Sequence, residues 1–240
     1  MADGTSWWPS GQQAAQQIEI GHHFMLARRF DRAAQCFRAA IRFEPENPDA
    51  YGRLAIALSE SRNLEEAERV AEYALGQWPN LSPILQVGAT VRHLRGQWQQ
   101  AVELLERAIA LSPETYVLHT YLGSILIEQG LHSEAEVPLR RALQLQPEDW
   151  GTLLQFAIVL IEQSKWQEAR SALDNALQQA PQESMTQTVA GYYLLQTNES
   201  ESAAVHLREA LRIDPDNRYA QHWLQAAMAR QEQPQPASPL

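Results

Sequence analysis

A proline recurs every 34 residues through most of this 240-residue chain, and this period constrains the fold more than any other feature. Two columns of alanine keep the same period. The three columns are Pro45, Pro79, Pro113, Pro147, Pro181 and Pro215; Ala33, Ala67, Ala101, Ala135, Ala169 and Ala203; and Ala40, Ala74, Ala108, Ala142, Ala176 and Ala210. A period of roughly 20–50 residues is typical of stacked structural repeats. We therefore expect an array of similar units, each packed against its neighbours.

Within one unit, apolar residues recur at helical spacing in two runs separated by a short polar turn. In residues 82–115, the third unit when the first is counted from Ala14, these runs cover residues 83–94 and 99–111, with Arg95-Gly96-Gln97 between them. This pattern predicts a hairpin of two antiparallel helices. The eighth position of every unit is small, which lets the two helices cross closely. These residues are Gly21, Ala55, Ala89, Gly123, Ala157 and Gly191.

The spacing that recurs from unit to unit closely resembles the repeat pattern of the tetratricopeptide repeat family. That family has a bulky residue at position 4, Leu at 7, Gly at 8, an aromatic residue or Leu at 11 and at 24, Ala at 20 and 27, and Pro at 32. Counted from Ala14, the first unit supplies Ile20, Gly21, Phe24, Ala33, Phe37, Ala40 and Pro45. The resemblance implies an all-α fold, a right-handed superhelical solenoid of six tandem helical hairpins. The expected units are residues 14–47, 48–81, 82–115, 116–149, 150–183 and 184–217.

The segments outside the six units are expected to differ in character. Residues 1–13 are predicted to be a flexible leader, and residues 218–230 a helix that caps the apolar end of the last hairpin. Residues 231–240 are rich in Pro and Gln and are predicted to be disordered.

Four departures from the family pattern lie inside the array. Ala71 replaces the large residue at position 24 in the second unit. Gly88 and Ala190 replace the large residue at position 7, so we expect looser packing in the third and sixth hairpins. Pro138 falls within the second helix of the fourth unit. It removes one backbone hydrogen bond and is expected to bend that helix slightly.

The charge and the cysteine content narrow the range of partners and locations. The formal net charge is −10, which opposes binding to a phosphate backbone, so no nucleic-acid partner is expected. A single cysteine, Cys36, excludes an intramolecular disulfide. The first residues lack the features of a signal peptide, and no apolar run is long enough to cross a membrane. We therefore expect a cytoplasmic protein without membrane insertion.

The sequence contains none of the motifs that usually accompany catalysis. It has no glycine-rich phosphate loop, no nucleophile elbow and no cysteine pair for zinc. Glu60, Glu128 and Glu162 recur near the end of the first helix in three units, and we interpret them as solvated side chains at a helix edge. The prediction is a chain that is not an enzyme and that has no catalytic residue, metal or cofactor.

The resemblance also implies a binding surface. In the family, the first helices form a concave wall lined by positions 5, 9 and 12 of each unit. The candidate groove residues here are Ile18, His22, Met25, Ile56, Thr90, His93, Thr120, Ser124, Ile127, Leu154, Ile158, Ile161, Tyr192 and Leu195. The Leu154–Ile158–Ile161 ridge with Tyr192 is the expected centre of binding. The hydroxyl groups of Thr90, Thr120, Ser124 and Thr188 could bond a peptide backbone. An alternative is that some of these side chains pack against the neighbouring hairpin.

Some members of the family bind the C-terminal carboxylate of chaperones through Lys, Asn and Arg at positions 5 and 9. This chain has Ile18 and His22, Gly52 and Ile56, and Gln86 and Thr90 at those positions, so a carboxylate clamp is not expected. The leading hypothesis is an adaptor or scaffold that holds a peptide or helix of another protein in the groove. Two alternatives stay open. The aromatic leader Trp7-Trp8-Pro9 could build homo-oligomers, or the chain could be a non-catalytic subunit of an enzyme complex.

Overall fold

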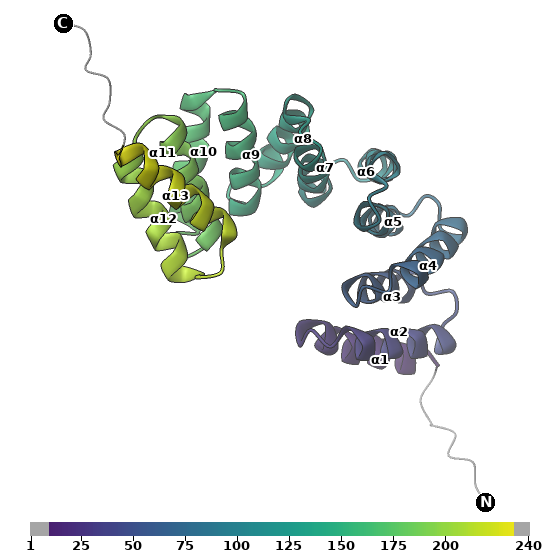
Figure 1. Cartoon of the computed structure of the whole chain (residues 1–240). Coiled ribbons are helices and arrows are strands. Elements are labelled where there is room, and N and C mark those ends of the chain that lie inside the picture. Colours follow the sequence, from purple (N-terminus) through teal and green to yellow (C-terminus); the bar gives the residue numbers. More distant parts are fainter. Residues whose placement is uncertain (1–9, 233–240) are drawn as a thin grey trace, which may run out of the picture. The chain divides into compact units, whose positions relative to one another are not determined.

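The computed structural model describes residues 10–232, and in this range the regular structure is entirely α-helical (Figure 1). The helices are α1 (Ser10–Leu26), α2 (Phe30–Phe43), α3 (Pro48–Glu60), α4 (Leu64–Gln77), α5 (Ser82–Leu94), α6 (Trp98–Leu111), α7 (Tyr116–Glu128), α8 (His132–Leu145), α9 (Trp150–Glu162), α10 (Trp166–Gln179), α11 (Ser184–Gln196), α12 (Ser200–Ile213) and α13 (Arg218–Glu232). The expected all-α repeat fold is confirmed.

The two ends of the array differ slightly from expectation. Helix α1 begins at Ser10, so residues 10–13 are helical and do not belong to a flexible leader. Helix α13 extends to Glu232, two residues beyond the predicted capping helix. The rest of the expected leader and tail, residues 1–9 and 233–240, lies outside the described residues.

The chain divides into two compact units, an N-terminal unit of residues 1–114 and a C-terminal unit of residues 115–240. In the N-terminal unit, helices α1 to α6 form three hairpins, with α2 packed against α3 and α4 packed against α5. In the C-terminal unit, α7 to α12 form three more hairpins in the same way, and α13 packs on α11 and α12. First helices also contact each other directly, as α3 does with α5 and α9 with α11.

The turn inside each hairpin has the same backbone conformation in every repeat. The residue at position 15 adopts a left-handed conformation, with φ between 54° and 73°. These residues are Arg28, Arg62, Gly96, Gly130, Ser164 and Asn198. Glycine takes this conformation without steric cost, whereas the other residue types are strained there. The turn is thus fixed by the repeat geometry even where the sequence does not supply glycine.

The two alanine columns lie where the helices approach most closely. Every alanine in both columns is at most 1% exposed. The small residue at position 8 serves the same crossing: a Cβ atom added to Gly123 would lie 2.5 Å from Leu139 Cγ. An added Cβ atom would likewise overlap the side chain of Phe37 at Gly21 and that of Leu207 at Gly191. The predicted role of the small residues in helix crossing is confirmed.

The expected loose packing at Gly88 is wrong. A Cβ atom at Gly88 would lie 2.8 Å from Leu75 Cδ1 and 3.2 Å from Leu104 Cδ1, so side chains from α4 and α6 already occupy the space. Ala190 is buried within the apolar core of the C-terminal unit. At Pro138, helix α8 continues unbroken from His132 to Leu145.

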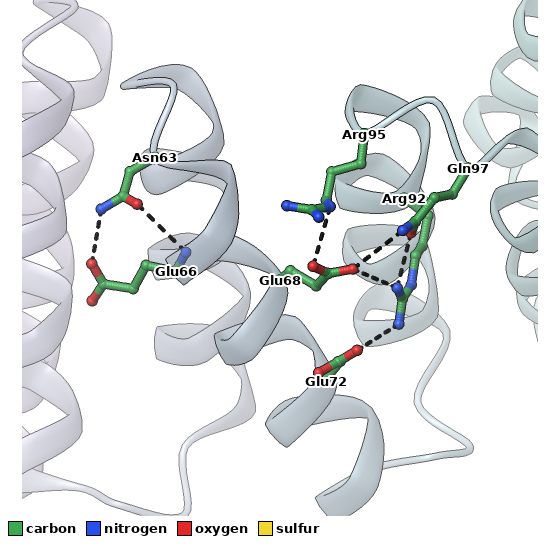
Figure 2. Close-up of polar contacts among 7 residues, drawn as sticks. All are labelled: Asn63, Glu66, Glu68, Glu72, Arg92, Arg95 and Gln97. Carbon is green, nitrogen blue, oxygen red and sulfur yellow. Dashed lines mark hydrogen bonds and ion pairs between the residues drawn. The ribbon is translucent and has the colours of Figure 1, made fainter.

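A network of ion pairs joins the second and third hairpins. Figure 2 shows Glu68 on α4 between two arginines of the next hairpin. Its carboxylate lies 2.6 Å from Arg92 Nη1 and 3.1 Å from Arg95 Nε, and Arg92 also reaches Glu72 at 2.8 Å. Arg92 donates a further hydrogen bond to the side chain of Gln97. The network therefore ties α4 to the helices that follow it.

Glu136 holds the same repeat position in the C-terminal unit as Glu68 holds in the N-terminal unit. Its carboxylate lies 2.6 Å from Lys165 Nζ and 2.7 Å from Arg140 Nη2. Arg140 also pairs with Glu168 of the next hairpin, at 3.0 Å. The hydrogen bonds from Lys165 and Arg140 lower the pKa of Glu136 from 4.5 to about 2. Glu136 thus stabilises the contact between the fourth and fifth hairpins in its charged form.

Replacing Glu136 by Gln is expected to lower the free energy of unfolding by about 1 kcal/mol at neutral pH. Because the pKa of Glu136 is depressed in the folded state, its contribution is complete above the unfolded pKa of 4.5. It is lost as the pH falls from there towards about 2. Urea denaturation of both proteins over this pH range measures the difference, which should shrink with falling pH.

Glu134→Gln is the matched control, because Glu134 lies on the same helix with an exposed side chain. It should change the free energy of unfolding by less than about 0.5 kcal/mol. A difference between wild type and Glu136→Gln that stays constant from neutral pH to pH ~2 would contradict the assignment.

Candidate functional site

Within each unit, the first helices of successive hairpins lie in contact and form one surface. In the N-terminal unit this surface includes α3 and α5, and in the C-terminal unit it consists of α7, α9, α11 and α13. Each of the two surfaces contains a pocket. We refer to them as the N-terminal pocket and the C-terminal pocket.

The N-terminal pocket has a volume of about 450 Å³ and a largely apolar lining. Its residues come from α1, α2, α3, α5 and the turn before α5. They are His22, Met25, Phe37, Pro48, Asp49, Gly52, Arg53, Ile56, Leu81, Pro83, Ile84 and Val87. The two charged residues neutralise each other, since Arg53 Nε donates to both carboxylate oxygens of Asp49 at 2.9 and 2.8 Å. The pocket therefore offers apolar contact with little net charge.

The C-terminal pocket has a volume of about 400 Å³ and a different chemistry. It is lined by Ile127, Ile158, Glu162, Met185, Thr188, Val189, Tyr192, Tyr219 and Trp223. Three of these side chains are aromatic and one is a carboxylate. None of the lining residues is a lysine or an arginine, so the charge of the pocket is negative.

Tyr192 occupies the centre of a connected group in the C-terminal pocket. Its hydroxyl donates a short hydrogen bond to Glu162 Oε1 on the preceding first helix. Its ring lies on the ring of Trp223 from α13, with centroids 4.6 Å apart and planes inclined by 35°. Burial and the hydrogen bond to Glu162 raise the pKa of Tyr192 well above its ordinary value of 10. Tyr192 is thus a neutral donor that fixes the orientation of Glu162.

The structure places six of the predicted groove residues at the two pockets. His22, Met25 and Ile56 line the N-terminal pocket. Ile127, Ile158 and Tyr192 line the C-terminal pocket.

Three other predicted residues are buried in the core. Leu154, Ile161 and Leu195 are 3%, 2% and 1% exposed. They pack between neighbouring helices, so a partner cannot reach them. The ridge expected at Leu154–Ile158–Ile161 is therefore represented at the surface by Ile158 alone, and this corrects the sequence-based prediction.

The threonines predicted to bond a peptide are already engaged within the protein. Thr90 Oγ1 donates to the Gln86 carbonyl at 3.0 Å, and Thr120 Oγ1 donates to the Tyr116 carbonyl at 3.2 Å. Thr120 Oγ1 also lies 2.7 Å from Thr152 Oγ1. Thr188 is buried, and its Oγ1 donates to the Ser184 carbonyl at 2.8 Å. The bonds to carbonyls return to the same helix, as is common for threonine inside helices, whereas the contact with Thr152 joins α7 to α9. These bonds reduce the capacity of the three threonines to bond an incoming backbone.

The remaining predicted residues lie outside the linings of both pockets. Ile18 packs against the core of the N-terminal unit, and the ring of His93 lies 5.0 Å from that of Trp98. Ser124 is half-buried on α7. The structure thus does not bring these three residues together with the others.

Sequence reasoning missed a second set of lining positions. Positions 2 and 6 of a unit face positions 9 and 12 of the unit before it. The residues concerned are Asp49, Arg53, Pro83 and Val87 in the N-terminal pocket, and Met185, Val189, Tyr219 and Trp223 in the C-terminal pocket. Positions 2, 5, 6 and 9 share one helix face, so the helical period could have revealed them. Glu162 was also missed, because it was interpreted as a solvated residue at a helix edge.

Among residues 10–232, no three or more His, Cys, Asp or Glu side chains lie together in a way that could hold a metal ion. None of the helices described there combines the length and the apolar character that a membrane span requires.

Comparisons with known proteins agree with this architecture. A tetratricopeptide repeat family model matches residues 18–82 and 154–218, and a model for subunit 3 of the anaphase-promoting complex, or cyclosome, matches residues 94–176. No curated protein matches the chain in sequence.

Several solved structures share the fold. YrrB, described as a TPR protein with an unusual peptide-binding site, is 25% identical, with a TM-score of 0.61, over 79% of this chain and 97% of its own. PilF of Pseudomonas aeruginosa is 18% identical, with a TM-score of 0.76, over 90% and 98%. A chain of the APC/C hetero-tetramer Cut9–Hcn1 is 18% identical, with a TM-score of 0.78, over 90% and 43%.

The helical hairpins, their 34-residue period and the buried alanine columns agree with the family match, which extends over more than half of the chain. The chain belongs to the tetratricopeptide repeat family.

Proposed function

We propose that this chain is a non-catalytic adaptor or scaffold that holds a peptide or helical segment of a partner protein on its first helices. The N-terminal pocket and the C-terminal pocket are the two anchor points in this proposal. The observation that carries it is the pair of open, mostly apolar pockets of about 450 and 400 Å³, each built from successive first helices. Pockets of this size and character accept apolar or aromatic side chains of a bound segment.

The side chains at the first helices also indicate how the partner is held. Ile56 on α3 and Ile158 on α9 are half-buried, each in the wall of one pocket. Apolar side chains in the wall of a pocket pack against the side chains that a bound segment inserts there and exclude water from them. YrrB, which has the same fold and 25% identity, is described as having a peptide-binding site, and this supports the same class of ligand here. Binding through a carboxylate clamp is not part of the proposal.

The test compares capture of proteins from a lysate of the source organism by wild type and by the Ile56→Arg, Ile158→Arg double variant. Each arginine places a charge and a longer side chain in one pocket, so the captured amount of the partner should fall at least about tenfold. Circular dichroism and thermal unfolding first establish that the variant is folded.

The matched control is the Val137→Arg, Val205→Arg double variant, since both valines are exposed on the second helices α8 and α12. It should capture the partner like wild type. Loss of the partner in the control alone would move the binding surface to the second helices. Capture of only the chain itself would favour a self-assembling scaffold. A captured enzyme whose activity depends on this chain would favour an accessory subunit.

A further inference from the structure

The two pockets differ in the chemistry that they can recognise. In the N-terminal pocket the single carboxylate, Asp49, is paired with Arg53. In the C-terminal pocket the single carboxylate, Glu162, lies on an exposed residue at the end of α9, and no ion pair with a Lys, Arg or His is found for it among residues 10–232. Glu162 is thus available to an external cation.

The aromatic side chains stand next to this carboxylate. Tyr192 donates its hydroxyl hydrogen to Glu162 and stacks on Trp223, which in turn is in edge contact with His222, with centroids 4.8 Å apart. Tyr219, on the same helix α13 as Trp223, lines the same pocket and is 66% exposed. Aromatic faces attract cations, most strongly where water is partly excluded.

The pocket also has an apolar lining without rings. Ile127, Ile158, Met185 and Val189 come from three successive first helices and supply an apolar lining. A side chain with a long apolar stem and a positively charged end would match this lining, with its stem on the apolar residues and its charge beside Glu162 and the aromatic rings. Lysine and arginine are the two protein side chains of this kind.

We propose that the C-terminal pocket binds a lysine or arginine side chain of the partner protein, with Glu162 as the counter-ion and Tyr192, Tyr219 and Trp223 as the aromatic surface. This inference rests on the proposed function and names the chemistry of one of its two anchor points. The net charge of −10 favours the approach of a basic segment over long range. An acidic side chain would be repelled by Glu162.

The experiment uses the full chain and two pairs of short probes, Ac-Ile-Arg-Ile-NH2 with its citrulline analogue, and Ac-Ile-Lys-Ile-NH2 with its norleucine analogue. Citrulline keeps the shape of arginine without its charge, and norleucine keeps the apolar stem of lysine. Titrations are followed by the NMR signal of the Trp223 indole N–H, which is assigned with Trp223→Phe. Each cationic probe should bind at least about fivefold more tightly than its neutral analogue.

Three variants separate the contributions. Glu162→Gln keeps the size of the side chain and can still accept from Tyr192, yet it should reduce the preference for the cationic probe to less than about twofold. Tyr219→Leu should lower the affinity for the cationic probes about threefold. Glu201→Gln makes the same change of charge at an exposed site on α12, away from the pocket lining, and should leave the preference unchanged.

Equal affinity for charged and neutral probes in wild type would overturn the proposal, as would a preference that survives Glu162→Gln. So would the absence of any shift of the Trp223 signal at millimolar concentrations of the cationic probes. In each of these cases the capture experiment still tests the proposed function on its own. If the Ile56→Arg, Ile158→Arg variant loses a partner in that experiment, the partner binds at the pockets without a lysine or arginine side chain beside Glu162.

Discussion

Ala135→Asp is expected to lower the free energy of unfolding of the C-terminal unit by about 3 kcal/mol or more. Ala135 is completely buried on α8 in a core that also contains Leu139 and Phe156. An aspartate at this position must bury a carboxylate without a partner or push the two helices of the hairpin apart. Urea denaturation followed by circular dichroism measures the loss.

Val137→Asp is the matched control for this prediction. Val137 lies two residues further along the same helix and is 73% exposed, so the new carboxylate remains in water. It should change the free energy of unfolding by no more than about 0.5 kcal/mol. If the two variants were equally stable, the alanines at position 20 would not mark a close helix crossing. The role assigned to position 20 in every repeat would then be wrong.

The buried columns could be predicted from sequence because their physical requirement repeats. A close crossing tolerates only a small side chain, so the same residue type returns every 34 residues, and its periodicity is visible without coordinates. The positions of Ala135 and Gly123 in the core follow directly from this. The left-handed turn at position 15 was not predicted, because Arg28, Arg62 and Ser164 have no residue preference that indicates it.

The candidate binding surface could be predicted only in part, because the exposure of its residues depends on neighbouring helices. Leu154 and Ile158 lie four residues apart on one face of α9, yet Leu154 is buried and Ile158 lines a pocket. The difference arises because the neighbouring helices α7 and α11 both pack on α9, and the sequence period does not show how far each covers it. The helical position of a residue thus predicts which face of the helix it lies on. Only the structure shows which residues of that face, such as Leu154, are buried and which, such as Ile158, line a pocket.

Tyr219 and Trp223, the two aromatic residues that α13 adds to the C-terminal pocket, were missed for a related reason. Trp223 was predicted to cap the last hairpin, which assigns it to packing alone. In the structure α13 continues the row of first helices, and Trp223 and Tyr219 fall at positions 6 and 2 of that row. A capping helix that keeps the register of the repeat extends the surface formed by the first helices and also closes the core.

Gly191→Ala is expected to lower the free energy of unfolding by about 2 kcal/mol, although alanine is the better helix former. An added Cβ atom would lie 2.4 Å from Leu207 Cγ and 2.7 Å from Leu207 Cδ2. Leu207 is fully buried, so it can move only by displacing its neighbours. The expected strain exceeds the gain of about 1 kcal/mol in helix propensity. Urea denaturation again provides the measurement.

Gly151→Ala in the same unit is the control, because its nearest side-chain atom, Asp149 Oδ2, would lie at 3.6 Å, an ordinary contact. It should be neutral or slightly stabilising, by up to about 0.5 kcal/mol.

A double-mutant cycle with Leu207→Ala isolates the clash behind the Gly191→Ala loss. Leu207→Ala should cost at least about 1 kcal/mol less in the Gly191→Ala background than in wild type, because the smaller side chain relieves the overlap. The second hairpin already combines two alanines, Ala55 and Ala71, at these positions. The third combines Ala89 with Leu105, so an alanine can be accommodated if the helices separate slightly. A Gly191→Ala variant as stable as wild type would mean that the sixth hairpin makes this adjustment freely, and that glycine at position 8 does not set the distance between its helices.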